Sequence, residues 1–125
     1  MVIVPPWDIR DRAFEFSCDV VRYCFKLGAN PACRTVATQL LRAATSVGAN
    51  TEEAKAAYSR REFALKNSHA LKEARETQFW LRLIVRCGLA HDERETERLR
   101  AEAGELVGIL TATVRSARRP GQPSP

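Results

Sequence analysis

Hydrophobic residues recur every three to four positions along most of the chain, and short stretches with glycine, asparagine or proline separate the periodic segments. This spacing is typical of helices with one apolar face, and no alternating run of β-branched residues favours a strand. The pattern predicts four helices at about residues 8–27, 32–58, 60–87 and 92–118, with a disordered tail at 120–125.

The chemistry of the helix ends agrees with these boundaries. Ser59 is followed three residues later by Glu62, and Asp92 by Glu95, which is the spacing of a capping box. Gly28 follows the first helix, where glycine commonly ends a helix in the left-handed conformation. Short connections make successive helices antiparallel. We therefore predict one all-α domain in residues 1–119, an up-down-up-down antiparallel four-helix bundle.

Each predicted helix has one apolar stripe for the bundle core. These core positions are Ile9, Ala13, Phe16, Val20 and Leu27; Val36, Leu40, Val47, Ala54 and Tyr58; Phe63, Ala70, Ala74, Thr77, Leu81 and Ile84; and Leu99, Ala103, Leu106, Leu110 and Ala117.

The first and third helices have more apolar surface than one core requires. The additional residues are Phe14, Val21 and Phe25 on the first helix and Leu65, Phe79 and Leu83 on the third. Exposed apolar faces usually mark a partner surface, so we expect a homo-oligomer with these residues in the contact. The alternative is that the N-terminal segment VIVPPW covers one of these faces.

The composition is that of an ordinary soluble globular protein, with 45% hydrophobic and 28% charged residues. Its net charge of +5 favours acidic partners, including nucleic acid. Arginines that share a helix face or close the fourth helix are the candidate phosphate contacts; the alternative is that they are solvated. They are Arg75, Arg82, Arg86, Arg115, Arg118 and Arg119.

No apolar run is long enough to span a membrane, and the N-terminus lacks the pattern of a signal peptide, so we expect a cytoplasmic protein with no membrane partner. The four cysteines lack a zinc-binding spacing and should be reduced, buried thiols. No phosphate loop, catalytic triad or di-iron motif is present. We expect no metal, no cofactor, no catalytic residues and no enzymatic activity.

Polar residues flank the core on the second and third helices. Arg42, Ser46, Asn50 and Glu53 share one stripe, and Glu62, His69, Glu73 and Trp80 share another. They are either solvated or form a network at a helix or subunit contact, with Arg42 and Glu73 as the pair to test. Glu76 should form a surface ion pair with Lys72. Within the same stretch, SVGAN supplies small residues that allow another helix to approach closely.

The segment QLLRAATSVGANTEEAKAAYSRREFALKNSHALKEARETQFWLRLI resembles the 23S rRNA intervening sequence proteins. The resemblance rests on Gln39, Arg42, Ser46, Asn50, Glu53, Ser59, Arg60, Phe63, Glu73, Glu76, Thr77 and Trp80. It differs at Gly48, where many members have proline, and at Thr51 and Glu52, where they commonly have isoleucine and alanine.

The resemblance implies a four-helix protomer in a ring-like homopentamer, from a gene sometimes found within rRNA intervening sequences. A similar fold serves as the accessory protein of diversity-generating retroelements, a basic pentamer that associates with a reverse transcriptase and nucleic acid. It implies no catalytic residues. The leading interpretation is thus an oligomeric, non-enzymatic helical scaffold that contacts RNA or a ribonucleoprotein; the alternatives are a protein-binding oligomer without nucleic acid, or an enzyme with a site near Arg42 and Glu73.

Overall fold

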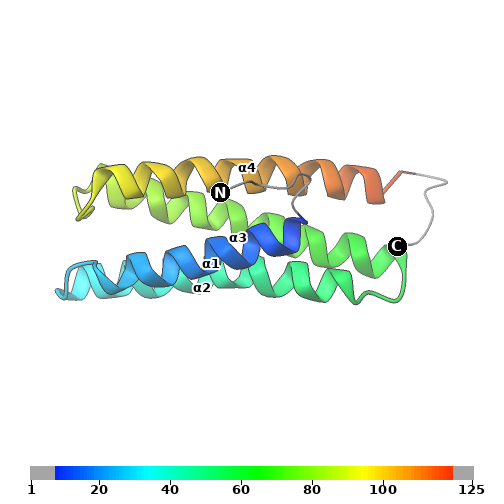
Figure 1. The fold of residues 1–125 in the computed structure, drawn as a ribbon, viewed down its shortest axis with the longest axis horizontal. Helices are drawn as coiled ribbons and strands as arrows, with labels where there is room; N and C mark the ends of the chain where they lie inside the picture. Colours follow the sequence, from blue (N-terminus) through cyan, green and yellow to red (C-terminus); the bar gives the residue numbers. More distant parts are fainter. Residues whose placement is uncertain (1–7, 120–125) are drawn as a thin grey trace, which may run out of the picture.

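Four helices run side by side along the long axis of the molecule in a computed structural model that describes residues 8–119 (Figure 1). They are α1 (Ile9–Phe25), α2 (Pro31–Lys55), α3 (Arg60–Arg86) and α4 (Glu93–Ala117). The described range holds no strand, which confirms the prediction of an all-α fold. The predicted tail 120–125 and the segment VIVPPW lie outside the described residues.

The helices pack as a closed four-helix bundle. Each helix contacts the next one in the chain, and α1 also contacts α4, whereas the Cα atoms of the diagonal pairs α1/α3 and α2/α4 stay more than 8 Å apart within the described range. The outer faces of α1 and α3 therefore lie on opposite sides of the bundle. This separation matters because these two helices have the extra apolar residues.

Side chains cap the N-termini of the helices. The Ser59 hydroxyl accepts a hydrogen bond from the Glu62 N–H at 3.1 Å, and the Glu62 carboxylate accepts one from the Tyr58 N–H at 3.1 Å. The Asp92 carboxylate accepts from the Glu95 N–H at 3.2 Å. These bonds satisfy backbone donors that have no partner within their helix, so local sequence fixes where α3 and α4 begin.

The sequence predicts longer first and second helices than the structure has. α1 ends at Phe25 because the Lys26 and Leu27 N–H groups bond to carbonyls three residues back, and Gly28 is not in the left-handed region, unlike Gly88 with φ 68°. α2 ends at Lys55 through the same tightening at Ala56 and Ala57. The chain then turns outward to reach its cap at Ser59.

That turn removes one predicted core residue. Tyr58 is 96% exposed, so its assignment to the core is wrong. Phe63, Ile9 and Leu27 are only partly buried, because each lies near an end of its helix where neighbouring helices no longer enclose it. The other predicted core positions are buried, and Tyr23 joins them.

The buried side chain of Tyr23 forms a hydrogen bond with a residue of another helix. Its hydroxyl lies 2.7 Å from the Thr96 hydroxyl of α4, and the Thr96 hydroxyl in turn donates to the Asp92 carbonyl at 2.8 Å. The Tyr23 hydroxyl is therefore the donor to Thr96. A buried phenol of this kind is tolerated because its polar atom is satisfied.

Small residues in the SVGAN stretch allow α1 and α2 to approach closely. The Ser17 hydroxyl donates to the Ala13 carbonyl of its own helix at 2.9 Å and lies 3.3 Å from the Ala44 carbonyl of α2. A Cβ atom added at Gly48 would lie 2.8 Å from the Ser17 Oγ. Gly48 thus leaves the space that this serine fills, and SVGAN continues as regular helix.

Candidate nucleic-acid interface

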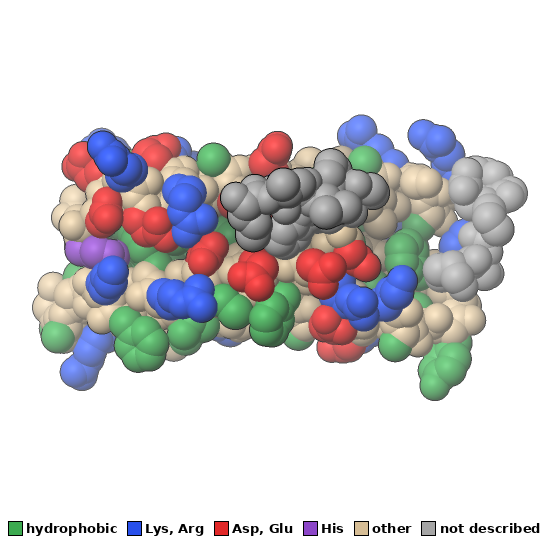
Figure 2. Space-filling view, in the orientation of Figure 1, with side chains coloured by type: hydrophobic (Ala, Val, Ile, Leu, Met, Phe, Trp, Pro, Cys, Tyr) green, Lys and Arg blue, Asp and Glu red, His purple; other side chains and the backbone are tan. Residues whose placement is uncertain are grey.

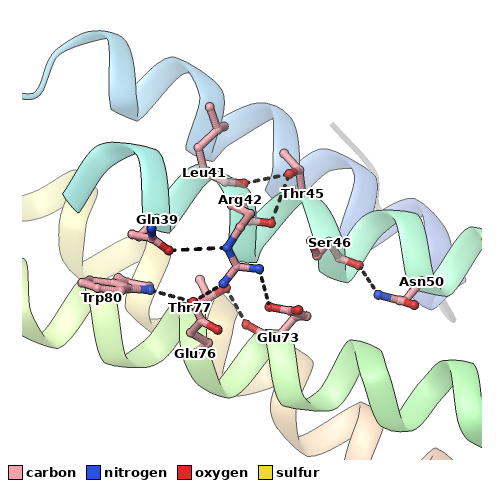
Figure 3. A network of polar contacts seen from close by, with 10 residues as sticks. All are labelled: Gln39, Leu41, Arg42, Thr45, Ser46, Asn50, Glu73, Glu76, Thr77 and Trp80. Carbon is pink, nitrogen blue, oxygen red and sulfur yellow. Dashed lines mark hydrogen bonds and ion pairs between the residues drawn. The ribbon is translucent and has the colours of Figure 1, made fainter. Parts of the chain in front are cut away.

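Arg42 of α2 reaches two carboxylates of α3 (Figure 3). Its guanidinium donates to the Glu73 carboxylate at 3.4 Å and to the Glu76 carboxylate, with the Gln39 amide oxygen 3.5 Å from its Nε. The Trp80 indole N–H donates to Glu76 at 3.0 Å. These contacts connect neighbouring helices along their shared shoulder.

The charges of this network stabilise one another. The indole N–H of Trp80 and the Arg42 guanidinium lower the pKa of Glu76, while the hydrogen bond to Glu76 raises the pKa of Arg42. Glu76 therefore stays ionised at neutral pH and is poorly suited to donate a proton. The arrangement fits a role in holding α2 and α3 in register.

The remaining predicted members of this network have other partners. The Asn50 amide donates to the Ser46 backbone carbonyl at 2.9 Å, and Glu53 pairs with Lys66 of α3 at 2.6 Å. Neither Ser46 nor Asn50 bonds to Arg42, because they lie one and two turns further along α2 (Figure 3). The predicted stripe thus consists of separate contacts.

Glu76 and Gln39 are the residues that the predicted network lacks. The sequence pairs Glu76 with Lys72 on the same helix, whereas the structure gives Glu76 to Arg42 and Trp80. Glu73 and Glu76 are three residues apart, so they share a helix face. That spacing is the signal that could have assigned both carboxylates to one arginine.

The outer face of α3 has a different character. Residues spaced by three, four or seven positions form one exposed stripe that is basic and apolar and contains no acidic residue. We call its cations the basic stripe: Arg61, Lys72, Arg75, Arg82 and Arg86. None of these five side chains forms a hydrogen bond or ion pair in the described part of the chain, and Leu65 and Phe79 lie between them.

Two hollows flank Phe79 on this face. One of about 460 Å³ is lined by Arg75, Phe79, Arg82 and residues of α4 that include Arg100. The other, of about 410 Å³, extends from Phe79 past Arg82 toward Arg86. The one acidic residue among the lining residues, Glu97, pairs with Arg100 at 2.7 Å. The hollows are therefore positive in net charge.

This geometry brings together residues that the sequence assigns to different functions. Phe79 and Leu83 are predicted for the oligomer contact, yet they line the same surface as Arg82, predicted for nucleic acid. Leu83 is also partly buried against the core, so it offers little surface. Leu65 is exposed at the other end of α3.

The arginines that close α4 lie at that other end. Arg115 and Arg119 are exposed, and Arg118 donates to the Ser68 hydroxyl at 2.8 Å. Arg118 shares a hollow of about 650 Å³ with Arg61 and Leu65. The arginines at the end of α4 thus extend the basic surface of α3 beyond its first turn.

On the α1 side of the bundle, charged side chains of α1 and α4 form ion pairs with one another. Arg12 pairs with Glu102 at 2.6 Å, and Arg98 pairs with Asp19 at 3.3 Å across α1 and α4. Acidic and basic side chains alternate on this face, and apolar groups gather along its lower edge (Figure 2). Phe14 is 59% and Phe25 84% exposed, and Val21 is exposed between them.

The described residues offer no cluster of three or more His, Cys, Asp or Glu side chains that could hold a metal ion. None of the described helices is both long and apolar enough to cross a membrane. Burial raises the pKa of the Cys24 thiol to about 11, so this cysteine stays protonated and unreactive at neutral pH. The sequence predicts that all four cysteines are buried, but only Cys33 is: Cys18 and Cys24 are partly buried, and Cys87 is exposed.

Comparison with known families matches residues 7–112 to the 23S rRNA-intervening sequence protein family. The chain belongs to this family. It is also similar to the crystal structure of a protein of unknown function from the S23 ribosomal protein family of Bacteroides thetaiotaomicron. The two are 33% identical and superpose with a TM-score of 0.78, over 86% of this chain and 95% of that one. No curated protein matches the chain significantly.

Proposed function

We propose that this protein is a non-enzymatic, oligomeric helical scaffold whose basic stripe contacts RNA, either directly or within a ribonucleoprotein. The observation that carries the proposal is the basic stripe itself, in which five exposed cations lack acidic partners among the described residues. Several cations elsewhere on the bundle, such as Arg12 and Arg98, are paired with carboxylates, and no other helix has five unpaired cations on one face within the described residues. Unpaired cations on one face create a positive field that attracts a phosphate backbone.

The dimensions of the stripe suit this partner. Arg61 and Arg86 are 25 residues apart on one helix, so they are separated by about 38 Å along its axis. A row of cations of this length can contact several successive phosphates of one nucleic-acid strand. The family name, which refers to a 23S rRNA intervening sequence, is consistent with an RNA partner. A reverse transcriptase bound to its RNA is a second partner of the same chemistry.

Salt-dependent binding of rRNA fragments tests the proposal. Affinity should fall steeply with salt, and Arg75→Gln with Arg82→Gln should reduce the log–log salt slope by about two, since each arginine replaces one counterion. The matched control is Arg34→Gln with Lys55→Gln, which removes the same charge from α2, where both side chains are exposed and have no ion-pair partner within residues 8–119. Absence of binding at low salt, or equal effects of both double variants, would contradict the proposal.

The oligomer rests on the outer face of α1. Phe14, Val21 and Phe25 form an apolar stripe there, on the side of the bundle opposite the basic stripe. A ring of more than two subunits requires two unlike contact faces on each protomer, and this stripe supplies one of them. We therefore assign the subunit contact to α1 and propose the homopentamer that the family resemblance implies.

Sedimentation at micromolar concentration tests the assembly. The mass should be a multiple of 14.0 kDa, and Phe14→Glu with Phe25→Glu should return it to the monomer. Thr35→Glu with Thr38→Glu on α2 is the control, because it adds the same two charges at exposed positions that are assigned to no contact. A wild-type monomer would exclude the oligomer.

The exposed α1 face also favours a second candidate, an oligomeric protein-binding module without a nucleic-acid role. Phe25 at 84% exposure is the strongest single sign of such a contact. RNA binding at low salt distinguishes the two candidates. An enzyme with a site at Arg42 and Glu73 is the least favoured, because Arg42 already engages both nearby carboxylates. A cytoplasmic location remains a prediction from the sequence.

A further inference from the structure

Phe79 is the exposed aromatic residue of the basic face. It is 47% exposed, although the α3 positions two residues before and after it, Thr77 and Leu81, are buried. An exposed phenylalanine forgoes favourable burial, and its position among cations suits a partner that is both flat and anionic. A nucleobase within a single strand, with its adjoining phosphates, has these two properties.

The surroundings hold the Phe79 ring in place. The Trp80 ring packs against it edge to face, with 4.9 Å between ring centroids. Trp80 is itself fixed by the bond from its indole N–H to Glu76. A ring that is held before binding loses little entropy on contact, which favours stacking.

Cations flank the ring on both sides. Arg75 lies one turn before Phe79 and Arg82 one turn after it, so they are about 6 Å and 4.5 Å away along the helix axis. Both line the 460 Å³ hollow beside the ring, and Arg82 also lines the second hollow. A base in either hollow would have its neighbouring phosphates beside an unpaired guanidinium.

We propose that Phe79 is a stacking platform for a base of single-stranded RNA, with Arg75 and Arg82 holding the phosphates on either side. The site rests on the proposed RNA-binding function. It adds a preference for single strands, which charge alone does not distinguish from duplexes. Bases in a duplex are already stacked and paired, so they cannot reach the ring. The basic face therefore prefers unpaired RNA.

Phe79→Leu tests this preference, because leucine keeps an apolar side chain and removes the aromatic ring. Binding is measured by fluorescence anisotropy with three labelled probes of equal length: a mixed-sequence single strand, a duplex RNA, and an abasic single strand. The variant should bind the mixed single strand roughly fivefold or more weakly, the lower end of one stacking contact, and should bind the other two probes as wild type does. Phe79→Tyr should restore binding of the single strand.

Tyr58→Leu is the matched control, since it removes an exposed aromatic ring near the opposite end of α3, at a position assigned to no contact. If Phe79→Leu weakened binding of all three probes equally, or weakened binding of none, the stacking site would be overturned. The RNA-binding function would still stand in either case, provided that binding by wild type fell steeply with salt. A change in sedimentation mass for Phe79→Leu would assign the face to a second copy and overturn the site. If wild type binds no probe at low salt, both proposals fail.

Discussion

The Ser17 side chain of α1 fills the space that Gly48 of α2 leaves where the two helices pack together. The Ser17 Oγ would be 2.8 Å from a Cβ at residue 48, closer than real Cβ atoms come to their neighbours. The serine also bonds to carbonyls of both helices. The pair therefore sets how closely the two helices approach.

Gly48→Ala should destabilise the protein although alanine is the better helix former. The substitution gains about 1 kcal/mol of helix propensity. Overpacking costs about 1–3 kcal/mol, since Ser17 is short and its rotation breaks its bonds. Urea unfolding followed by circular dichroism should show a loss of up to about 2 kcal/mol.

In a protein that already has Ser17→Ala, the effect of Gly48→Ala on stability should have the opposite sign. Without the hydroxyl, Gly48→Ala should stabilise the protein by up to about 1 kcal/mol, because the propensity gain remains and the clash is gone. Additive effects of the two substitutions would show that the contact does not determine the helix spacing.

The features that the sequence predicts correctly are those that depend on local chemistry. Ser59 with Glu62 and Asp92 with Glu95 act within one turn, so their spacing alone identifies the helix starts. The helical period likewise identifies most core positions. Tyr58 continues that period, but the turn needed to reach the cap at Ser59 takes it out of the core.

Features that depend on how one helix is rotated against another are harder to predict. Arg42 has Glu73 and Glu76 within reach, and only the packed bundle shows that it binds both. Tyr23 can be buried because the Thr96 hydroxyl of α4 accepts a hydrogen bond from the Tyr23 hydroxyl. The two competing assignments for the outer face of α3 arise because periodicity places Phe79 and Arg82 together without identifying their partner.

The buried Tyr23–Thr96 pair should respond unequally to losing either partner. Tyr23→Phe removes one donor and should cost about 0.5–1.5 kcal/mol, because Thr96 keeps its bond to the Asp92 carbonyl. Thr96→Val leaves the buried Tyr23 hydroxyl without an acceptor and should cost about 1–3 kcal/mol. Urea unfolding measures both values. The double variant should cost less than their sum, and equal costs for the two single variants would contradict the assigned direction of the bond.

Charge reversal at Arg42 should be rescued in part when one of its two carboxylates is also reversed, and further when both are. Arg42→Glu should lower the melting temperature, because the substitution would place a third carboxylate beside those of Glu73 and Glu76. Adding Glu73→Arg should restore part of the loss, and adding Glu76→Arg as well should restore more. Calorimetry at low salt measures the series. Full recovery of the melting temperature on adding Glu73→Arg alone would show that the contact between Arg42 and Glu76 contributes nothing to stability.

The depressed pKa of Glu76 makes part of the stability depend on pH. Hydrogen bonds from Trp80 and Arg42 lower its folded-state pKa below the ordinary value of 4.5, and bonding to Arg98 does the same for the pKa of Glu95. Each carboxylate therefore stabilises the fold above about pH 4.5, and this contribution is lost as the pH falls through the lowered folded-state pKa.

Glu76→Gln should make the acid-side loss of stability shallower than in wild type, since glutamine does not titrate. The Glu76 side chain is 36% exposed, so solvent screening keeps the change well below about 1 kcal/mol. Trp80→Phe keeps the carboxylate but removes its first donor, so the folded-state pKa of Glu76 rises toward 4.5, and the acid-side loss should be smaller and end at higher pH than in wild type. Denaturant midpoints measured from neutral pH to about pH 3 provide the comparison. An unchanged acid limb in Glu76→Gln would mean that the Arg42 and Trp80 contacts add no stability to the folded protein.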